Sequence, residues 1–187
     1  DDRYPSDVAL QRSVLQTEYS DKILGSFVKR MKEAGIWQRS LFIVTADHGV
    51  SYRPGGSRRP VTKQNLPELA NTPLFVKLPG QSKGAVDTGF TQSIDIAPTV
   101  AQVTKTGDGL KLDGVPLGSE NKKRVVAVRN GRAEKKITGD WNQMIEQRDE
   151  LARSWSELFP PGRASLYRLG PNQNLIGRQV SSLQVGS

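Results

Sequence analysis

Asp47 and His48 are adjacent side chains that can both bind a metal ion, and Gly49 follows them. A carboxylate supplies an anionic oxygen and a neutral imidazole supplies a nitrogen, and both are ligands for divalent cations. Gly49 places no side chain in the way of a close approach. His48 is the only histidine, and the absence of cysteine excludes thiolate ligands and a cysteine nucleophile within these residues. Two ligands do not complete a metal site, and the same residues are also common in ordinary turns.

The residues that follow form a basic loop rich in proline and glycine, which favours irregular structure. Loops at strand ends often bind substrates, and cationic side chains in this loop can meet an anionic group. The candidate substrate-binding residues are Arg53, Arg58 and Arg59, and Lys63 is the preferred candidate for a catalytic contact. The alternative is that these side chains are simply exposed to solvent.

Residues 41–45 precede Asp47 and are apolar or β-branched, which predicts a strand buried on both faces. In an open parallel α/β sheet, ligands bind at the carboxyl ends of the strands. Residues 6–34 show helical spacing, and the apolar stripe is expected to pack on the sheet; it comprises Leu15, Tyr19, Ile23, Leu24, Phe27, Val28 and Met31. Gly35 suits the left-handed position after the helix, with Ile36 next to Met31.

A second buried strand is predicted at residues 73–78, and a further helix is predicted to begin near Asp95. The Asp95 carboxylate can ligate a metal, but capping of the helix explains it sufficiently. Residues 104–118 are rich in turn formers and indicate a boundary. We therefore divide the chain into residues 1–118, an α/β domain, and residues 119–187, a C-terminal subdomain.

The C-terminal subdomain is predicted to hold an antiparallel hairpin followed by an amphipathic helix. Strands at residues 124–129 and 133–138 flank an Asn-Gly pair, and an apolar stripe runs from Trp141 to Phe159 before two prolines. The aromatic residues of this stripe are expected to lie in the core. The polar tail at residues 162–187 has no assigned role.

The chain carries a formal charge of +8, and this excess is spread along the sequence. Only 6% of residues are aromatic and basic runs are not interleaved with aromatics, which argues against nucleic-acid binding. No stretch approaches the roughly 20 apolar residues that a membrane-spanning helix needs. An anionic substrate or an anionic surface remains compatible with the charge.

Four segments together resemble the C-terminal half of sulfatases in the alkaline phosphatase superfamily. They are, in order, TADHG at 45–49, NTPLFVKLPG at 71–80, IDIAPT at 94–99 and DGVPL at 113–117. The resemblance implies a partial alkaline-phosphatase-like α/β sandwich and cleavage of sulfate or phosphate esters with one or two divalent metals. Asp47 and His48 match the metal-ligating pair of the family, and Lys63 is similar to its active-site lysine.

The resemblance also implies that the nucleophile and the first metal carboxylates lie upstream of Asp1, in a missing N-terminal half. We expect the chain to be a C-terminal fragment, inactive alone and unable to hold a metal tightly. An imidazole ligand suits zinc or manganese, whereas mostly carboxylate ligands suit calcium. The leading interpretation is hydrolysis of sulfate esters.

Two alternatives remain open at this stage. One is a phosphohydrolase or a transferase of phospho-alcohol groups from the same superfamily, and the other is a non-catalytic binding domain. The general arrangement is similar to membrane-anchored bacterial sulfatases. This similarity implies a parent protein in the bacterial cell membrane whose catalytic domain lies outside the cytoplasm.

Overall fold

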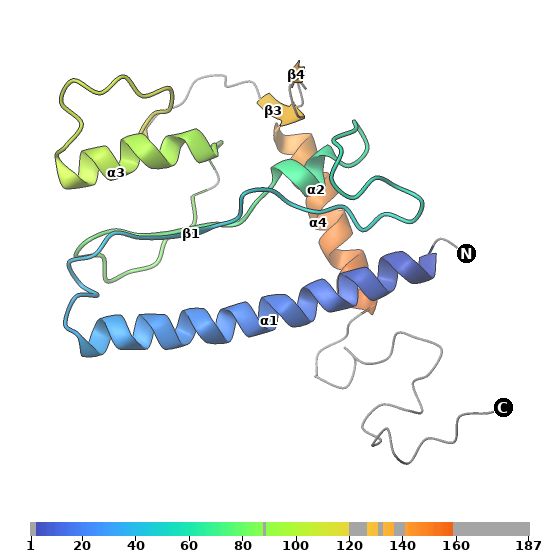
Figure 1. Ribbon diagram of the computed structural model, residues 1–187, viewed down its shortest axis with the longest axis horizontal. Helices are drawn as coiled ribbons and strands as arrows, with labels where there is room; N and C mark the ends of the chain where they lie inside the picture. The colour runs from blue at the N-terminus through green and yellow to red at the C-terminus, as the bar shows by residue number, and fades with distance from the viewer. Residues whose placement is uncertain (1–2, 88, 120–126, 131–132, 137–140, 159–187) are drawn as a thin grey trace, which may run out of the picture.

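The computed structural model describes residues 3–87, 89–119, 127–130, 133–136 and 141–158 (Figure 1). The elements in order are α1 (Arg3–Glu33), β1 (Phe42–Thr45), α2 (Leu66–Ala70), β2 (Leu74–Lys77), the 3-10 helix η1 (Ser93–Asp95), α3 (Ile96–Thr104), β3 (Ala127–Asn130), β4 (Ala133–Lys136) and α4 (Trp141–Leu158). The predicted tail at 162–187, Phe159 and the outer parts of the predicted hairpin strands lie outside the described residues.

The long helix α1 ends as its sequence predicts. Gly35 has a φ of 68°, and its N–H donates to the carbonyl of Lys32 at 3.0 Å. The N–H of Ile36 donates to the carbonyl of Met31, also at 3.0 Å. This pair of bonds is a Schellman motif, which satisfies carbonyls that the helix itself leaves unpaired.

The apolar stripe of α1 is far less buried than predicted. Tyr19, Ile23 and Phe27 are 66%, 54% and 53% exposed, although the Phe27 ring stacks on Phe42 of β1 with centroids 6.0 Å apart. The reason is geometric: 31 residues of helix extend about 46 Å, whereas two paired strands are only about 10 Å wide. The contact between Phe27 and Phe42 shows one place where the stripe packs on the sheet.

β1 and β2 form a two-stranded antiparallel sheet in which Phe42 pairs with Lys77 and Thr45 pairs with Leu74. The expectation of a parallel sheet with a fully buried strand is wrong for this pair. Residues 42–44 are half-buried and Thr45 is exposed, so the described elements do not bury this strand on both faces. The combination of these helices with an antiparallel pair of strands is compatible with a partial alkaline-phosphatase-like α/β fold.

Lys77, at the end of β2, closes the turn between α1 and β1. Its ammonium donates hydrogen bonds to the carbonyl oxygens of Trp37, Gln38 and Ser40, the last two at 3.1 Å. The same ammonium lies 5.0 Å from the centroid of the Trp37 ring. One cation thereby joins the turn before β1 to the end of β2.

The small core joins α2 to α4, which lie beside each other in Figure 1. Leu66 and Met144 are 3% and 4% exposed, and the half-buried Val61, Ala70 and Phe90 pack against them. Trp155 of α4 is half-buried and its ring meets Tyr52 edge-on at 6.0 Å. The division of the chain at residue 118 stays a prediction.

Asp95 fastens a later loop to the start of α3. It takes the N-cap position of α3, but its carboxylate makes no cap bond and accepts from the backbone N–H groups of Gln92 at 2.9 Å and Val115 at 3.0 Å. The hydroxyl of Thr99 accepts from the N–H of Leu117 at 2.8 Å. Asp95 is therefore the N-cap residue of α3 as predicted, but its side chain caps η1 and not α3, and both carboxylate oxygens accept from the backbone.

The predicted C-terminal hairpin is confirmed, with Asn130 paired to Ala133 and Ala127 paired to Lys136. The predicted helix from Trp141 is also confirmed as α4. Across the described ranges, none of the helices combines the length and apolar character required to cross a membrane.

Candidate functional site

Asp47 and His48 follow β1 directly, and the structure brings their side chains together. The Nε2 atom of His48 lies 3.5 Å from Oδ2 of Asp47. The other carboxylate oxygen, Oδ1, accepts the backbone N–H of His48 at 2.9 Å. This bond holds the carboxylate against the following peptide and leaves Oδ2 directed at the imidazole.

The opposite side of the imidazole is held by the backbone. Nδ1 of His48 lies 2.8 Å from the carbonyl oxygen of Gly49. A carbonyl can only accept a hydrogen bond, so in a neutral ring Nδ1 carries the hydrogen and Nε2 carries a free lone pair. A backbone contact of this kind orients many metal-ligating histidines.

These two donor atoms are exposed and are not joined by a third acidic or histidine ligand. The side chains of Asp47 and His48 are 87% and 43% exposed. Within the described ranges, no group of three or more His, Asp, Glu or Cys side chains is arranged to hold a metal ion. The pair therefore fits half of a metal site, and the donor set is open on its outer side.

Gly49 is required by packing on α2. A Cβ atom at this position would lie 1.8 Å from the carbonyl oxygen of Glu68 and 3.1 Å from Cα of Leu69. The N–H of Gly49 also donates to the carbonyl of Leu69 at 2.9 Å. Gly49 thus allows the backbone of α2 to lie where a side chain would otherwise be.

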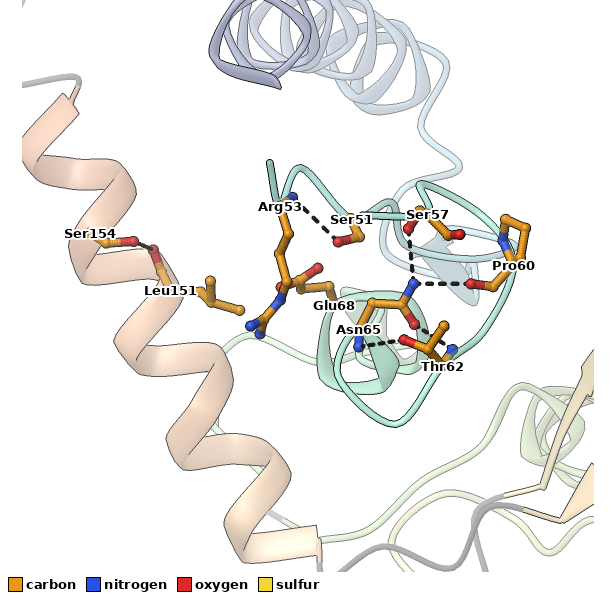
Figure 2. A network of polar contacts seen from close by, with 9 residues as sticks. All are labelled: Ser51, Arg53, Ser57, Pro60, Thr62, Asn65, Glu68, Leu151 and Ser154. Atoms are coloured by element: carbon orange, nitrogen blue, oxygen red, sulfur yellow. Dashed lines mark hydrogen bonds and ion pairs between the residues drawn. The ribbon is translucent and has the colours of Figure 1, made fainter. Parts of the chain in front are cut away.

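The same helix also holds Arg53. Its Nε donates to Oε1 of Glu68 at 2.5 Å, and the Glu68 side chain is only 2% exposed (Figure 2). Oε2 of Glu68 is buried without a hydrogen-bond partner among the described residues. A buried carboxylate needs a paired cation, so Arg53 is fixed to α2 by its Nε, and no described residue bonds to its two terminal nitrogens.

Asn65 shapes the rest of the basic loop. It is 3% exposed, and its amide donates to the carbonyls of Ser57 at 2.9 Å and Pro60 at 3.0 Å (Figure 2). Its Oδ1 accepts the N–H of Thr62 at 2.7 Å. One buried amide therefore satisfies backbone groups of the loop that would otherwise lack partners.

The four predicted basic residues are divided between two cavities. Arg53 and Lys63 line a cavity of about 610 Å³ between the loop and α4, together with Gln64, Gln147, Glu150, Leu151 and Ser154. Figure 2 shows Arg53 extending toward Leu151 of α4. Arg58 and Arg59 line a second cavity, of about 590 Å³, next to α1. The four basic residues thus form two separate groups.

Sequence reasoning missed α2 and with it Glu68 and Asn65. The sequence does hold a signal for this helix, because Asn65 precedes a proline in the first turn and an acidic residue follows. Arg12 of α1, which lines the cavity with Arg58 and Arg59, was also missed. No local pattern identifies it, because its partners lie more than forty residues away in the sequence.

Comparisons with known proteins agree with the resemblance of the sequence motifs. A family model described as Sulfatase matches residues 9–106, slightly more than half of the chain. Lipoteichoic acid synthase 1 of Bacillus subtilis is 29% identical over 127 residues, which cover 64% of this chain and 20% of that protein. Endo-4-O-sulfatase of Bacteroides thetaiotaomicron is 26% identical over 150 residues, covering 76% of this chain and 27% of that protein.

A third relative is a multifunctional alkaline phosphatase superfamily protein of Trinickia caryophylli. It is 33% identical over 85 residues, which cover 44% of this chain and 16% of that protein. No solved structure matches the chain. The chain thus spans about a quarter or less of the length of these curated relatives.

Proposed function

The chain belongs to the sulfatase family, and we propose that it supplies one wall of a metal-dependent site that hydrolyses sulfate esters. Domains of this family are generally metal-dependent and act on sulfate or phosphate esters. The observation that carries the proposal is the 3.5 Å separation of Nε2 of His48 and Oδ2 of Asp47 at the tip of β1.

This separation suits two ligands of one cation. Zinc bonds to nitrogen and oxygen at about 2.0 to 2.2 Å in tetrahedral geometry, so neighbouring ligands are about 3.3 Å apart. In the neutral ring Nε2 has a free lone pair, and within the described residues the backbone N–H of His48 bonds to Oδ1 and not to Oδ2, so both Nε2 and Oδ2 can ligate. The imidazole favours zinc or manganese over calcium.

The open side of the pair faces outward, and we propose that the remaining ligands and the nucleophile come from another part of a longer protein. When bound, the cation would act as a Lewis acid on the ester oxygens. The residues of this chain would position the cation. The Gly49 carbonyl orients the His48 imidazole, and the hydrogen bond from Gly49 to Leu69 fixes the segment after β1 on α2. Small shifts of the two ligands would misplace the substrate.

Arg53 and Lys63 are the proposed contacts to the anionic ester. Both line the cavity beside α4, where Arg53 is held by Glu68 and Lys63 is exposed. A guanidinium whose orientation is already fixed loses less side-chain entropy on binding an oxyanion. Glu150 in the same cavity adds an acceptor for hydroxyl groups of the alcohol part.

A second candidate is transfer of a phospho-alcohol group. The observation that favours it is that two of the relatives are named lipoteichoic acid synthases, from Bacillus subtilis and Staphylococcus saprophyticus. The same metal ligands would serve either reaction, because both stabilise negative charge on a transferring oxyanion. For either activity, we propose a parent protein anchored in the bacterial cell membrane with this domain outside the cytoplasm.

The test compares the Asp47→Ala and His48→Ala variants of the full-length protein with Asp21→Ala, an exposed carboxylate on α1. Bound metal is measured by mass spectrometry, and turnover is measured with p-nitrophenyl sulfate and p-nitrophenyl phosphate. We expect both site variants to lose metal and at least about a hundredfold in turnover, while Asp21→Ala keeps both. Unchanged metal and activity in Asp47→Ala would contradict the proposal, and preference between the two esters separates the two candidate functions.

A further inference from the structure

A groove of about 590 Å³ lies between the first half of α1 and the loop that follows Gly49. Three arginines from two distant parts of the sequence converge on it, namely Arg12 of α1 with Arg58 and Arg59 of the loop. Neither Asp47 nor His48 lines this groove. The volume is in the range of small-molecule sites, which extends from about 300 to 1,000 Å³.

Among the residues that the structure describes, no acidic side chain compensates the charge of Arg12 and Arg59 in the groove. No carboxylate is among the lining residues, and in the described part of the chain no acidic side chain makes an ion pair with Arg12 or Arg59. Like charges gathered in a concave surface repel one another and raise the local concentration of anions. The groove therefore favours an anionic occupant.

Hydrogen bonds with the backbone fix Arg58 relative to the helix. The N–H of Ser51, which is 1% exposed, donates to the carbonyl of Arg58 at 3.1 Å. One terminal nitrogen of Arg58 then donates to the carbonyl of Pro5 in α1 at 3.3 Å. The loop and the helix are thus joined at the groove, and the other guanidinium donors of Arg58 remain available.

The remaining wall of the groove is largely apolar. Val8 and Ala9 of α1 and Val50 and Tyr52 of the loop line it, together with Pro5 and the uncharged polar residues Ser13 and Gln16. A simple hydrated ion gains nothing from such a wall, whereas an organic group attached to the anion would bury apolar surface there. The combination matches an anionic ester with an apolar or aromatic alcohol part.

We propose that this groove binds a sulfate or phosphate monoester, with the oxyanion on Arg12, Arg58 and Arg59 and the alcohol part on Val8, Val50 and Tyr52. Guanidinium groups bind such oxyanions through pairs of parallel hydrogen bonds. The ligand class rests on the proposed function, but binding in the groove needs neither the metal nor the nucleophile.

The experiment titrates the 187-residue chain with phenyl phosphate, phenyl sulfate, inorganic phosphate and inorganic sulfate in the presence of a chelator. NMR spectra follow the arginine Nε–H signals, which the single variants assign. We expect the phenyl esters to bind more tightly than the inorganic ions, and Arg12→Ala and Arg59→Ala each to weaken ester binding about tenfold. Arg12→Lys, which keeps the charge, is expected to lose less ester affinity than Arg12→Ala.

Arg30→Ala is the matched control, because it removes the same charge from an exposed position near the other end of α1. Equal losses in Arg30→Ala and Arg12→Ala would overturn the proposal in favour of unspecific screening. Equal affinity for inorganic phosphate and phenyl phosphate would overturn the assignment of an ester. Since the chelator removes divalent metal, a failure here is distinct from a failure of the site at Asp47 and His48.

Discussion

The N–H of Gly49 donates to the carbonyl of Leu69 at 2.9 Å, so the residue after the candidate metal ligands is bound to the last turn of α2. The helix backbone occupies the space beside Gly49, and any Cβ there would meet the carbonyl oxygen of Glu68. The position of Asp47 and His48 thus depends on a five-residue helix that lies about twenty residues further along the chain.

Gly49→Ala is expected to destabilise the protein by about 1 to 3 kcal/mol or more, since a methyl group must displace backbone that cannot rotate away. Urea denaturation followed by circular dichroism measures the loss. Gly84→Ala is the control, because a Cβ at Gly84 meets nothing within 4 Å. Equal stability of the two variants would show that α2 does not pack on Gly49 in solution.

Arg53→Ala is expected to lower the free energy of unfolding by about 2 to 3 kcal/mol, because it leaves the buried Glu68 carboxylate without a cation. The double variant Arg53→Ala/Glu68→Gln is expected to be more stable than Arg53→Ala, since a neutral buried amide costs less than an unpaired charge. Urea denaturation of both and of Glu68→Gln, with the exposed Arg39→Ala as control, gives the coupling. A double variant that is no more stable would argue against a buried ion pair.

Lys77→Met keeps the length of the side chain but removes the ammonium that serves three carbonyl groups. We expect a loss of about 1.5 to 3 kcal/mol, the range for hydrogen bonds that involve a charged group. Amide hydrogen exchange at residues 38 to 42 is expected to accelerate as the turn opens. Lys83→Met, at an exposed lysine, serves as the control, and similar exchange in both variants would refute the role of Lys77.

Local patterns predicted several elements closely. α1, the β1 and β2 strands, the C-terminal hairpin and α4 were all located within a few residues, and so was the left-handed Gly35. Helical periodicity, strand alternation and helix capping depend on residues within about five positions of one another, so a single sequence is enough to recognise them. The adjacent pair of Asp47 and His48 could also be identified from the sequence, because both candidate ligands lie in a single peptide segment.

The amino-acid sequence by itself thus determined α1, α3, α4, the strands and the family of this protein, but not α2. Only the tertiary structure decided how they meet: β1 and β2 pair antiparallel, the α1 stripe stays half-exposed, and α2 supplies the wall behind Gly49. It also separated Arg53 and Lys63 from Arg58 and Arg59, and it brought Arg12 to the latter pair. The physical reason is that these contacts join residues far apart in the chain, where packing and charge act through space and leave no local pattern.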